Sequence, residues 1–80
     1  MRPSSLDDII FSKHAADRMA EYNLTKQDVL YVMEDPDITR LGKPKGEPNF
    51  IRTLPNGHRV RVPAMVRGTR WFVFTVILES

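Results

Sequence analysis

The sequence contains no cysteine and no apolar run that approaches the roughly 20 residues of a membrane span. The missing cysteines exclude disulfides, thiolate metal sites and a cysteine nucleophile. The N-terminal segment M-R-P-S-S-L-D-D has no apolar stretch long enough for a signal peptide. We therefore expect a cytoplasmic protein that has no membrane segment.

The familiar motifs for cofactors and catalysis are also missing. There is no glycine-rich phosphate loop and no nucleophile elbow, and the acidic residues do not have the spacing of metal ligands. The sequence has no internal repeat. We expect one small domain over residues 1–80, with a helical part at 12–35 and a β-sheet part at 37–79, and with no metal and no cofactor.

Charge is distributed unevenly between the two halves of the chain. Residues 1–37 hold four Lys or Arg against eight Asp or Glu, a balance of −4, whereas residues 38–80 hold eight against two, a balance of +6. Such an asymmetry indicates a polyanion-binding surface on the basic half. Arginines that only keep the strands soluble would give the same composition.

Two helices are predicted in the acidic half. Ser12 is suited to cap a helix over 13–22, where apolar residues recur at helical spacing. A second helix starts after Thr25, which opens a variant capping box. Pro36 ends this helix, because the residue before a proline is driven out of the α region. Asn23 between the helices suits a left-handed C-cap, and the two short helices are expected to be antiparallel.

A period of two after Pro36 predicts a sheet with strands at 37–41, 50–54, 58–67 and 71–78. Residues 9–11 form either a very short strand or an apolar lead-in, and residues 42–48 form a basic loop. Pro55-Asn56-Gly57 predicts a three-residue loop with a left-handed Gly57. The fold class is thus α+β, with two N-terminal antiparallel α-helices packed on one face of a three- to four-stranded antiparallel β-sheet.

The pairing of the last two predicted strands decides where the arginines lie. If the even-numbered apolar residues of both strands face the helices, the turn must have an odd length, or a bulge must be present, for which Pro63 is the obvious site. An even turn without a bulge would bury unpaired arginines, at a cost of several kcal/mol each, and is rejected. The expected open face then combines three arginines with two uncharged side chains: Arg59, Arg61, Arg67, Trp71 and Thr75.

A sheet face of this kind suits a strand of nucleic acid. Guanidinium groups contact phosphates, and Trp71 offers a surface for base stacking. The alternative is that Trp71 and Ile77 pack under the N-terminal segment and that the arginines only keep the strands soluble. The candidate RNA-binding side chains are Lys13, Arg52, Arg59, Arg67, Arg70 and Trp71.

His14 and Arg18 lie one turn apart in the first predicted helix and are neighbours on its surface. Histidine is the side chain best suited to move a proton near neutral pH, and an adjacent cation favours the neutral imidazole that acts as a general base. The same spacing is typical of a border residue on an amphipathic helix, so both interpretations stay open. His58 follows the hairpin glycine, where histidines are usually exposed and idle. Thr75 has an ordinary alternative too, as a β-branched strand residue.

The sequence resembles a family of small bacterial and phage domains of unassigned function. The resemblance is carried by F-S-K-H-A-A-D-R-M-A-E, by a capped second helix ending E-D-P, by the strand R-V-R-V and by an apolar final strand, over residues 11–78. That family in turn resembles the RelE/barnase-like ribonuclease-toxin superfamily. The resemblance implies a RelE-like toxin fold, in which two helices cover one face of an antiparallel sheet and the other face cleaves RNA.

The resemblance also implies roles for individual residues. His14 matches the helix histidine and Arg18 its partner, whereas Arg61 matches a strand arginine and Thr75 a late-strand hydroxyl. The usual glycine at the helix corner is Asn23 here. A tyrosine or second basic residue, which some ribosome-dependent toxins place near the C-terminus, is absent, because the chain ends L-E-S.

We therefore expect a metal-independent, endoribonuclease-like toxin of a toxin–antitoxin or phage system. His14 would deprotonate the ribose 2′-hydroxyl, and Arg18 and Arg61 would stabilise the transition state. Thr75 would hold a phosphate oxygen. The expected partners are RNA and an acidic antitoxin protein. The alternative is a non-catalytic module, an inhibitor or a regulator, that binds RNA or an acidic protein through the basic sheet face.

Overall fold

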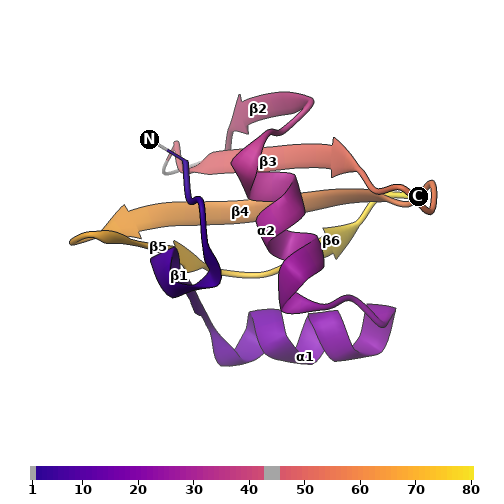
Figure 1. The fold of residues 1–80 in the computed structure, drawn as a ribbon, viewed down its shortest axis with the longest axis horizontal. Coiled ribbons are helices and arrows are strands. Elements are labelled where there is room, and N and C mark those ends of the chain that lie inside the picture. Colours follow the sequence, from indigo (N-terminus) through magenta and orange to yellow (C-terminus); the bar gives the residue numbers. More distant parts are fainter. Residues whose placement is uncertain (1, 43–45) are drawn as a thin grey trace.

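The computed structural model describes residues 2–42 and 46–80, which form two α-helices and a six-stranded sheet (Figure 1). A 3-10 helix, η1 (Leu6–Asp8), precedes strand β1 (Ile9–Phe11), and the helices α1 (Lys13–Tyr22) and α2 (Lys26–Glu34) follow. The remaining strands are β2 (Ile38–Leu41), β3 (Pro48–Thr53), β4 (Arg59–Arg67), β5 (Arg70–Val73) and β6 (Ile77–Leu78).

The two helices begin and end where the capping residues predict. The side chain of Ser12 accepts a hydrogen bond from the N–H of Ala15, and Asn23 ends α1 in the left-handed conformation with φ 58°. Thr25 and Asp28 form a reciprocal capping box at the start of α2. In the described part of the chain, neither helix is long and apolar enough to span a bilayer.

The sheet has the strand order β1-β5-β4-β3-β2, and β6 pairs with β4. β1 is parallel to β5, while the other pairs are antiparallel. The α+β class is confirmed. The prediction of a three- to four-stranded antiparallel sheet after two N-terminal helices is wrong, because residues 9–11 form an edge strand before α1 and the last predicted strand divides into β5 and β6.

Both helices pack on the same face of the sheet and share one core. Figure 1 shows α2 crossing β3 and β4, with α1 running crosswise below it, so the expected antiparallel helix pair is wrong. The core residues from the helices are Ala15 and Met19 of α1 and Val29, Val32 and Met33 of α2. The core residues from the facing strands include Phe50, Val60, Val62, Ala64, Trp71 and Val73.

The chain between β5 and β6 carries one extra residue. On β4 there are three steps from Arg61 to Ala64, whereas there are four from Val73 to Ile77, the residues that pair with them. An extra residue of this kind is a β-bulge, which exchanges the inward and outward positions of a strand. This exchange lets both Val73 and Val76 be buried, although they are three residues apart.

Pro63 of β4 lies opposite this bulge and accounts for it. The N–H of Phe74 donates to the carbonyl of Pro63 at 3.1 Å, but a proline has no N–H with which to return the bond. The carbonyl of Phe74 instead accepts from Oγ of Ser12 at 2.7 Å. A bulge is therefore present at Pro63, as predicted for this site, but its extra residue belongs to the neighbouring strand.

The turn between β4 and β5 has an even length, which was expected only together with a bulge, and the bulge follows β5. Arg67 pairs with Arg70 around Gly68, whose φ of 63° suits a two-residue hairpin. Trp71 therefore pairs with Val66 and points into the core, where it is 6% exposed. The predicted position of Trp71 on the arginine face is wrong. The arginines escape burial because both helices cover the other face.

The other turns agree with the sequence pattern where they are described. The N–H of Leu54 bonds to the carbonyl of His58, and Gly57 has a φ of 94°, so the predicted three-residue loop is confirmed. Of the loop expected over 42–48, residues 43–45 lie outside the described part, and Pro48 already belongs to β3.

The double role of Ser12 gives a stability prediction. Ser12→Ala removes the α1 cap and leaves the Phe74 carbonyl without its partner, so unfolding should become easier by about 2–3 kcal/mol. Thr25→Ala removes only the cap of α2 and should cost about 1 kcal/mol. Urea denaturation of both variants measures the difference. Equal losses of unfolding free energy in the two variants would show that the hydrogen bond from Ser12 to Phe74 adds no stability beyond the helix cap.

Candidate functional site

The sheet face opposite the helices, which we call the open face, carries most of the arginines of the basic half. In β4, alternate residues from Arg59 to Arg67 point to this face, because Val60, Val62 and Ala64 point into the core. The strand registers place further arginines beside them. The arginines of the open face are Arg40 of β2, Arg59, Arg61 and Arg67 of β4, and Arg70 of β5.

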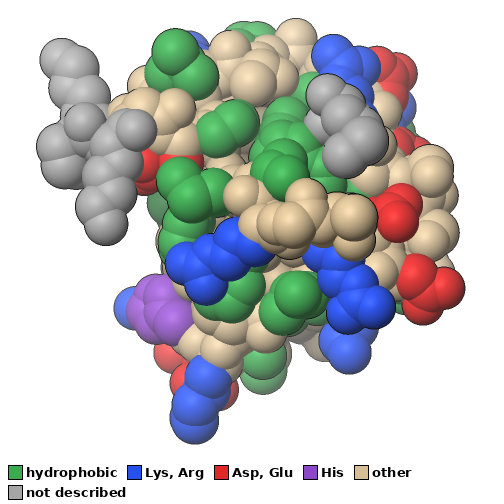
Figure 2. Space-filling view, turned by 90° about the vertical axis from the view of Figure 1, so that its left-hand side faces the viewer, with side chains coloured by type: hydrophobic (Ala, Val, Ile, Leu, Met, Phe, Trp, Pro, Cys, Tyr) green, Lys and Arg blue, Asp and Glu red, His purple; other side chains and the backbone are tan. Residues whose placement is uncertain are grey.

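Apolar side chains fill the space between these arginines. Phe72 pairs with Met65, and its ring meets that of Phe74 edge-on, with centroids 5.3 Å apart. Ile51, the partner of Arg61, is only 1% exposed although no described helix covers this face. Figure 2 looks at the end of the molecule where β4 and β5 meet and shows apolar side chains interleaved with Lys and Arg, with a histidine beside them.

Arg67 lies over the aromatic pair. Its Cζ atom is 4.1 Å from the ring centroid of Phe72 and 5.9 Å from that of Phe74. A guanidinium stacked on an aromatic ring keeps its N–H groups directed outward in its own plane, parallel to the ring, where they can donate to an acceptor. Arg67 is exposed, so this end of the open face presents a cation and two aromatic rings to a ligand.

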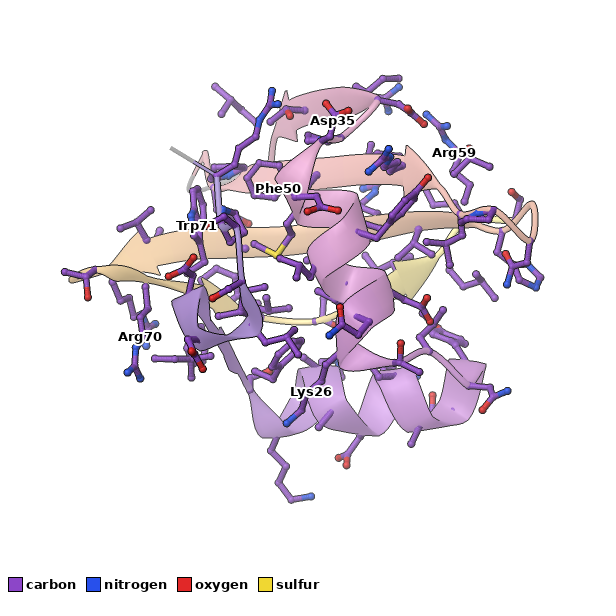
Figure 3. The ribbon with its side chains drawn as sticks, viewed as in Figure 1. Lys26, Asp35, Phe50, Arg59, Arg70 and Trp71 are labelled. Atoms are coloured by element: carbon purple, nitrogen blue, oxygen red, sulfur yellow. The ribbon has the colours of Figure 1, made fainter. Side chains whose placement is uncertain are left out.

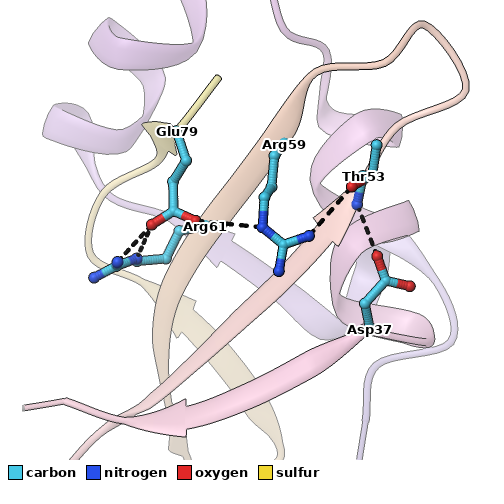
Figure 4. Close-up of polar contacts among 5 residues, drawn as sticks. All are labelled: Asp37, Thr53, Arg59, Arg61 and Glu79. Atoms are coloured by element: carbon cyan, nitrogen blue, oxygen red, sulfur yellow. Dashed lines mark hydrogen bonds and ion pairs between the residues drawn. The ribbon is translucent and has the colours of Figure 1, made fainter.

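Arg59 and Arg61 converge on one carboxylate (Figure 4). Nε of Arg61 lies 2.8 Å from Oε2 of Glu79, and Nε of Arg59 lies 3.7 Å from Oε1 of the same residue. The guanidinium of Arg59 also donates to Oγ1 of Thr53 at 3.3 Å, and the N–H of Thr53 donates to Asp37. One carboxylate therefore offsets one of the two positive charges of Arg59 and Arg61, whereas Arg67 has no ion pair among the described residues.

The candidate catalytic residues are distributed over three places. His14 is exposed in the first turn of α1, and Arg18 donates to Glu21 at 2.8 Å. Thr75 lies in the bulge between β5 and β6 and is half-buried. Two hydrogen bonds from Ser12, to the carbonyls of residues 73 and 74, seat the start of α1 against the strand just before Thr75.

The remaining predicted RNA-binding residues lie away from the open face or at its edge. Arg52 points to the helix side, where it donates to the carbonyl of Tyr31 at 2.7 Å and stacks 3.7 Å above its ring. Lys13 is exposed on α1 and pairs with Asp17 at 3.3 Å. Trp71 packs edge-on against Phe50 in the core, with ring centroids 5.2 Å apart (Figure 3). Trp71 is therefore not available for base stacking.

The aromatic pair and the acid of this surface were not predicted from the sequence. Phe72 and Phe74 take the place expected for Trp71, because the even turn reverses the faces of β5. The signal was Gly68 at the first central position of a two-residue turn, which is typical of a tight hairpin. Glu79 gave no local signal, since its partners lie in a strand 18 residues away from it.

A pocket of about 250 Å³ lies between Trp71 and the N-terminal segment. Its lining residues are Arg2, Pro3, Ser4, Asp8, Thr69 and Trp71. The indole N–H of Trp71 has no hydrogen-bond partner among the described residues. A hydrogen bond from the backbone N–H of Ser4 lowers the pKa of Asp8, and the N–H of Ser5 and the charge of Arg70 act in the same direction.

The lowered pKa of Asp8 predicts a pH dependence. The ionised carboxylate stabilises the folded chain above the ordinary pKa of 3.8, and this stabilisation is lost as the pH falls below that value. Asp8→Asn should therefore be less stable than the parent protein at neutral pH, and the difference should shrink in acid. Urea unfolding at a series of pH values measures it. If the difference in unfolding free energy between the parent protein and Asp8→Asn stays constant as the pH falls below 3.8, the role of Asp8 is contradicted.

Comparison with known proteins identifies the kind of domain. Residues 11–77 match the family described as Domain of unknown function (DUF4258). The chain belongs to this family. The expectation of an uncharacterised domain family is confirmed, and the DUF4258 match covers both helices and the strands β2 to β5. No curated protein and no solved structure matches the chain.

Proposed function

We propose that this DUF4258 domain binds a single strand of RNA on the open face of its sheet. The observation that carries the proposal is the stacking of exposed Arg67 on Phe72 and Phe74. This arrangement offers the two features that a single strand requires, a cation for the phosphate and aromatic rings for the bases.

The charge of the surface favours a polyanion. Arg67 and Arg70 are exposed at one end of the open face, and Arg40 is exposed on β2. Figure 3 shows Arg59 and Arg70 near opposite ends of the sheet, so the basic groups extend along it. A row of guanidinium groups binds phosphates with little dependence on sequence, and the affinity falls as salt rises.

The aromatic rings favour a single strand over a duplex. Bases in a duplex are stacked on each other, whereas unpaired bases can lie on protein side chains. Phe72 and Phe74 are half-buried, so their rings are held by the sheet and keep one part exposed. Stacking on such a ring contributes about 1–3 kcal/mol per base.

The role of Arg67 can be tested by removing its charge. Arg67→Gln should bind a fluorescently labelled single-stranded RNA about tenfold more weakly at low salt, since one phosphate contact and its support of the rings are lost. The slope of log K against log salt should become shallower by about 0.7, the value for one phosphate of a single strand. Fluorescence anisotropy measures both quantities.

Lys26→Gln is the matched control, because it removes the same charge from α2 on the other side of the sheet (Figure 3). Its affinity should stay close to that of the parent protein. An equal loss of RNA affinity in both variants would mean that only the net charge of the protein matters and not the position of Arg67. If the parent protein does not bind the RNA at low salt, the proposal is refuted.

A second candidate function is metal-independent RNA cleavage of the kind implied by the RelE/barnase resemblance. It is favoured by the bonds from Ser12 that hold the first turn of α1, which carries His14, beside the bulge that carries Thr75. His14 would deprotonate a ribose 2′-hydroxyl, and Thr75 would hold an oxygen of the adjacent phosphate. The 2′-oxygen would bond to the phosphorus of this phosphate as the P–O5′ bond breaks, and the leaving 5′-oxygen would take a proton from water, which gives a cyclic phosphate and a free 5′-hydroxyl. An acidic antitoxin-like protein that covers the open face would block both RNA binding and cleavage.

Cleavage predicts a specific loss on mutation. The purified protein should cleave single-stranded RNA in the presence of EDTA, and His14→Ala should reduce the rate about 100-fold or more without changing RNA affinity, since general base catalysis contributes about 10²–10⁴-fold. Gel analysis of end-labelled RNA gives the rate. Equal cleavage by both proteins would indicate a contaminating nuclease and remove His14 from this role.

A further inference from the structure

The C-terminal segment returns to the open face and places an acid among its arginines. β6 pairs with β4 at Arg61 and Val60, and beyond it the N–H of Glu79 donates to the carbonyl of Arg59 at 2.8 Å. The N–H of Arg59 in turn donates to the carbonyl of Ser80 at 3.1 Å. The backbone of Glu79 is therefore fixed beside β4, with its side chain between two guanidinium groups (Figure 4).

The two arginines surround the carboxylate in a geometry that would also fit a phosphate. Arg61 contacts Oε2 through both Nε and Nη2, while Arg59 approaches Oε1. A guanidinium fork matches the oxygens of a carboxylate and of a phosphate equally well. Oγ1 of Thr53, which contacts Arg59, adds a hydroxyl at the edge of the same site.

We infer that Arg59 and Arg61 form a phosphate-binding site and that Glu79 occupies this site until an RNA phosphate displaces it. The inference rests on the proposed RNA-binding function and adds a self-blocking group to it. The side chain of Glu79 is 23% exposed, and those of Arg59 and Arg61 are 32% and 34% exposed, so an incoming phosphate can reach all three.

An internal acid of this kind lowers RNA affinity. In the parent protein a phosphate must replace the carboxylate, so the ion pairs gained are offset by the ion pairs lost. When the acid is removed, both arginines are free to contact phosphates and to displace counterions from the RNA. Removal of Glu79 should therefore strengthen binding, whereas a residue that only supported the fold would weaken it.

The test is Glu79→Gln, which keeps the shape and the backbone bonds of the residue and removes its charge. We expect single-stranded RNA to bind about 5- to 20-fold more tightly at low salt. The slope of log K against log salt should steepen by roughly 0.7 for each arginine released. Fluorescence anisotropy with a labelled RNA gives both values, and circular dichroism confirms the fold of each variant.

Glu34→Gln is the matched control, since it removes the same charge from an exposed residue. Glu34 ends α2, which packs on the face of the sheet opposite the open face. Its gain in affinity should be small. A second comparison uses Arg61→Gln, which should weaken binding more in the Glu79→Gln background than in the parent protein, because Arg61 is released only there.

The outcomes separate the two proposals. If the parent protein binds RNA and Glu79→Gln binds no more tightly than Glu34→Gln, the inference about Glu79 is overturned and the RNA-binding function stands. If Glu79→Gln binds less tightly than the parent protein, the residue supports the site and does not block it. If no variant binds RNA at low salt, the proposed function fails, and the inference fails with it.

Discussion

The arrangement of this domain depends on a single missing hydrogen-bond donor in its central strand. Pro63 cannot donate to the carbonyl of Phe74, so the last strand leaves the ladder there with one extra residue and rejoins it as β6. Ser12 takes the free carbonyl with its side chain and at the same time caps α1. One proline thus sets the position of the first helix, the bulge that carries Thr75 and the course of the C-terminal segment.

The parts of the fold that were predicted correctly are those fixed by neighbours in the sequence. Ser12, Asn23 and Thr25 act on backbone groups within a few residues, so their types alone place both helices. Gly57 acts in the same way within its own loop. Long-range pairing gives no such signal. The parallel contact of residues 9–11 with Trp71–Val73 joins the two ends of the chain, and a three-residue segment does not reveal it.

The candidate site shows the same division. Alternation within β4 was enough to gather Arg59, Arg61 and Arg67 on one face, because a single strand fixes its own periodicity. The face of β5 depended on the turn and was predicted with the wrong parity, so Trp71 and Phe72 exchanged places. An even turn without a bulge was rejected because it was expected to leave the arginines covered. They are not, since both helices share the opposite face.

The C-terminal segment connects the construction of the sheet with the state of its arginines. β6 consists of two residues that pair with Val60 and Arg61 of β4, and the bonds between Arg59 and the backbone of Glu79 and Ser80 continue this pairing. β5 and β6 both pair with the same edge of β4, and Leu78 of β6 packs against the core while Glu79 lies beyond it beside the arginines. The same bulge that rejoins the strand one residue out of register also sets which face Glu79 lies on. Without the extra residue, the residue before Ile77 would pair with Arg61, and the side chain of Glu79 would lie on the opposite face of the sheet. Arg59 and Arg61 would then carry their full charge.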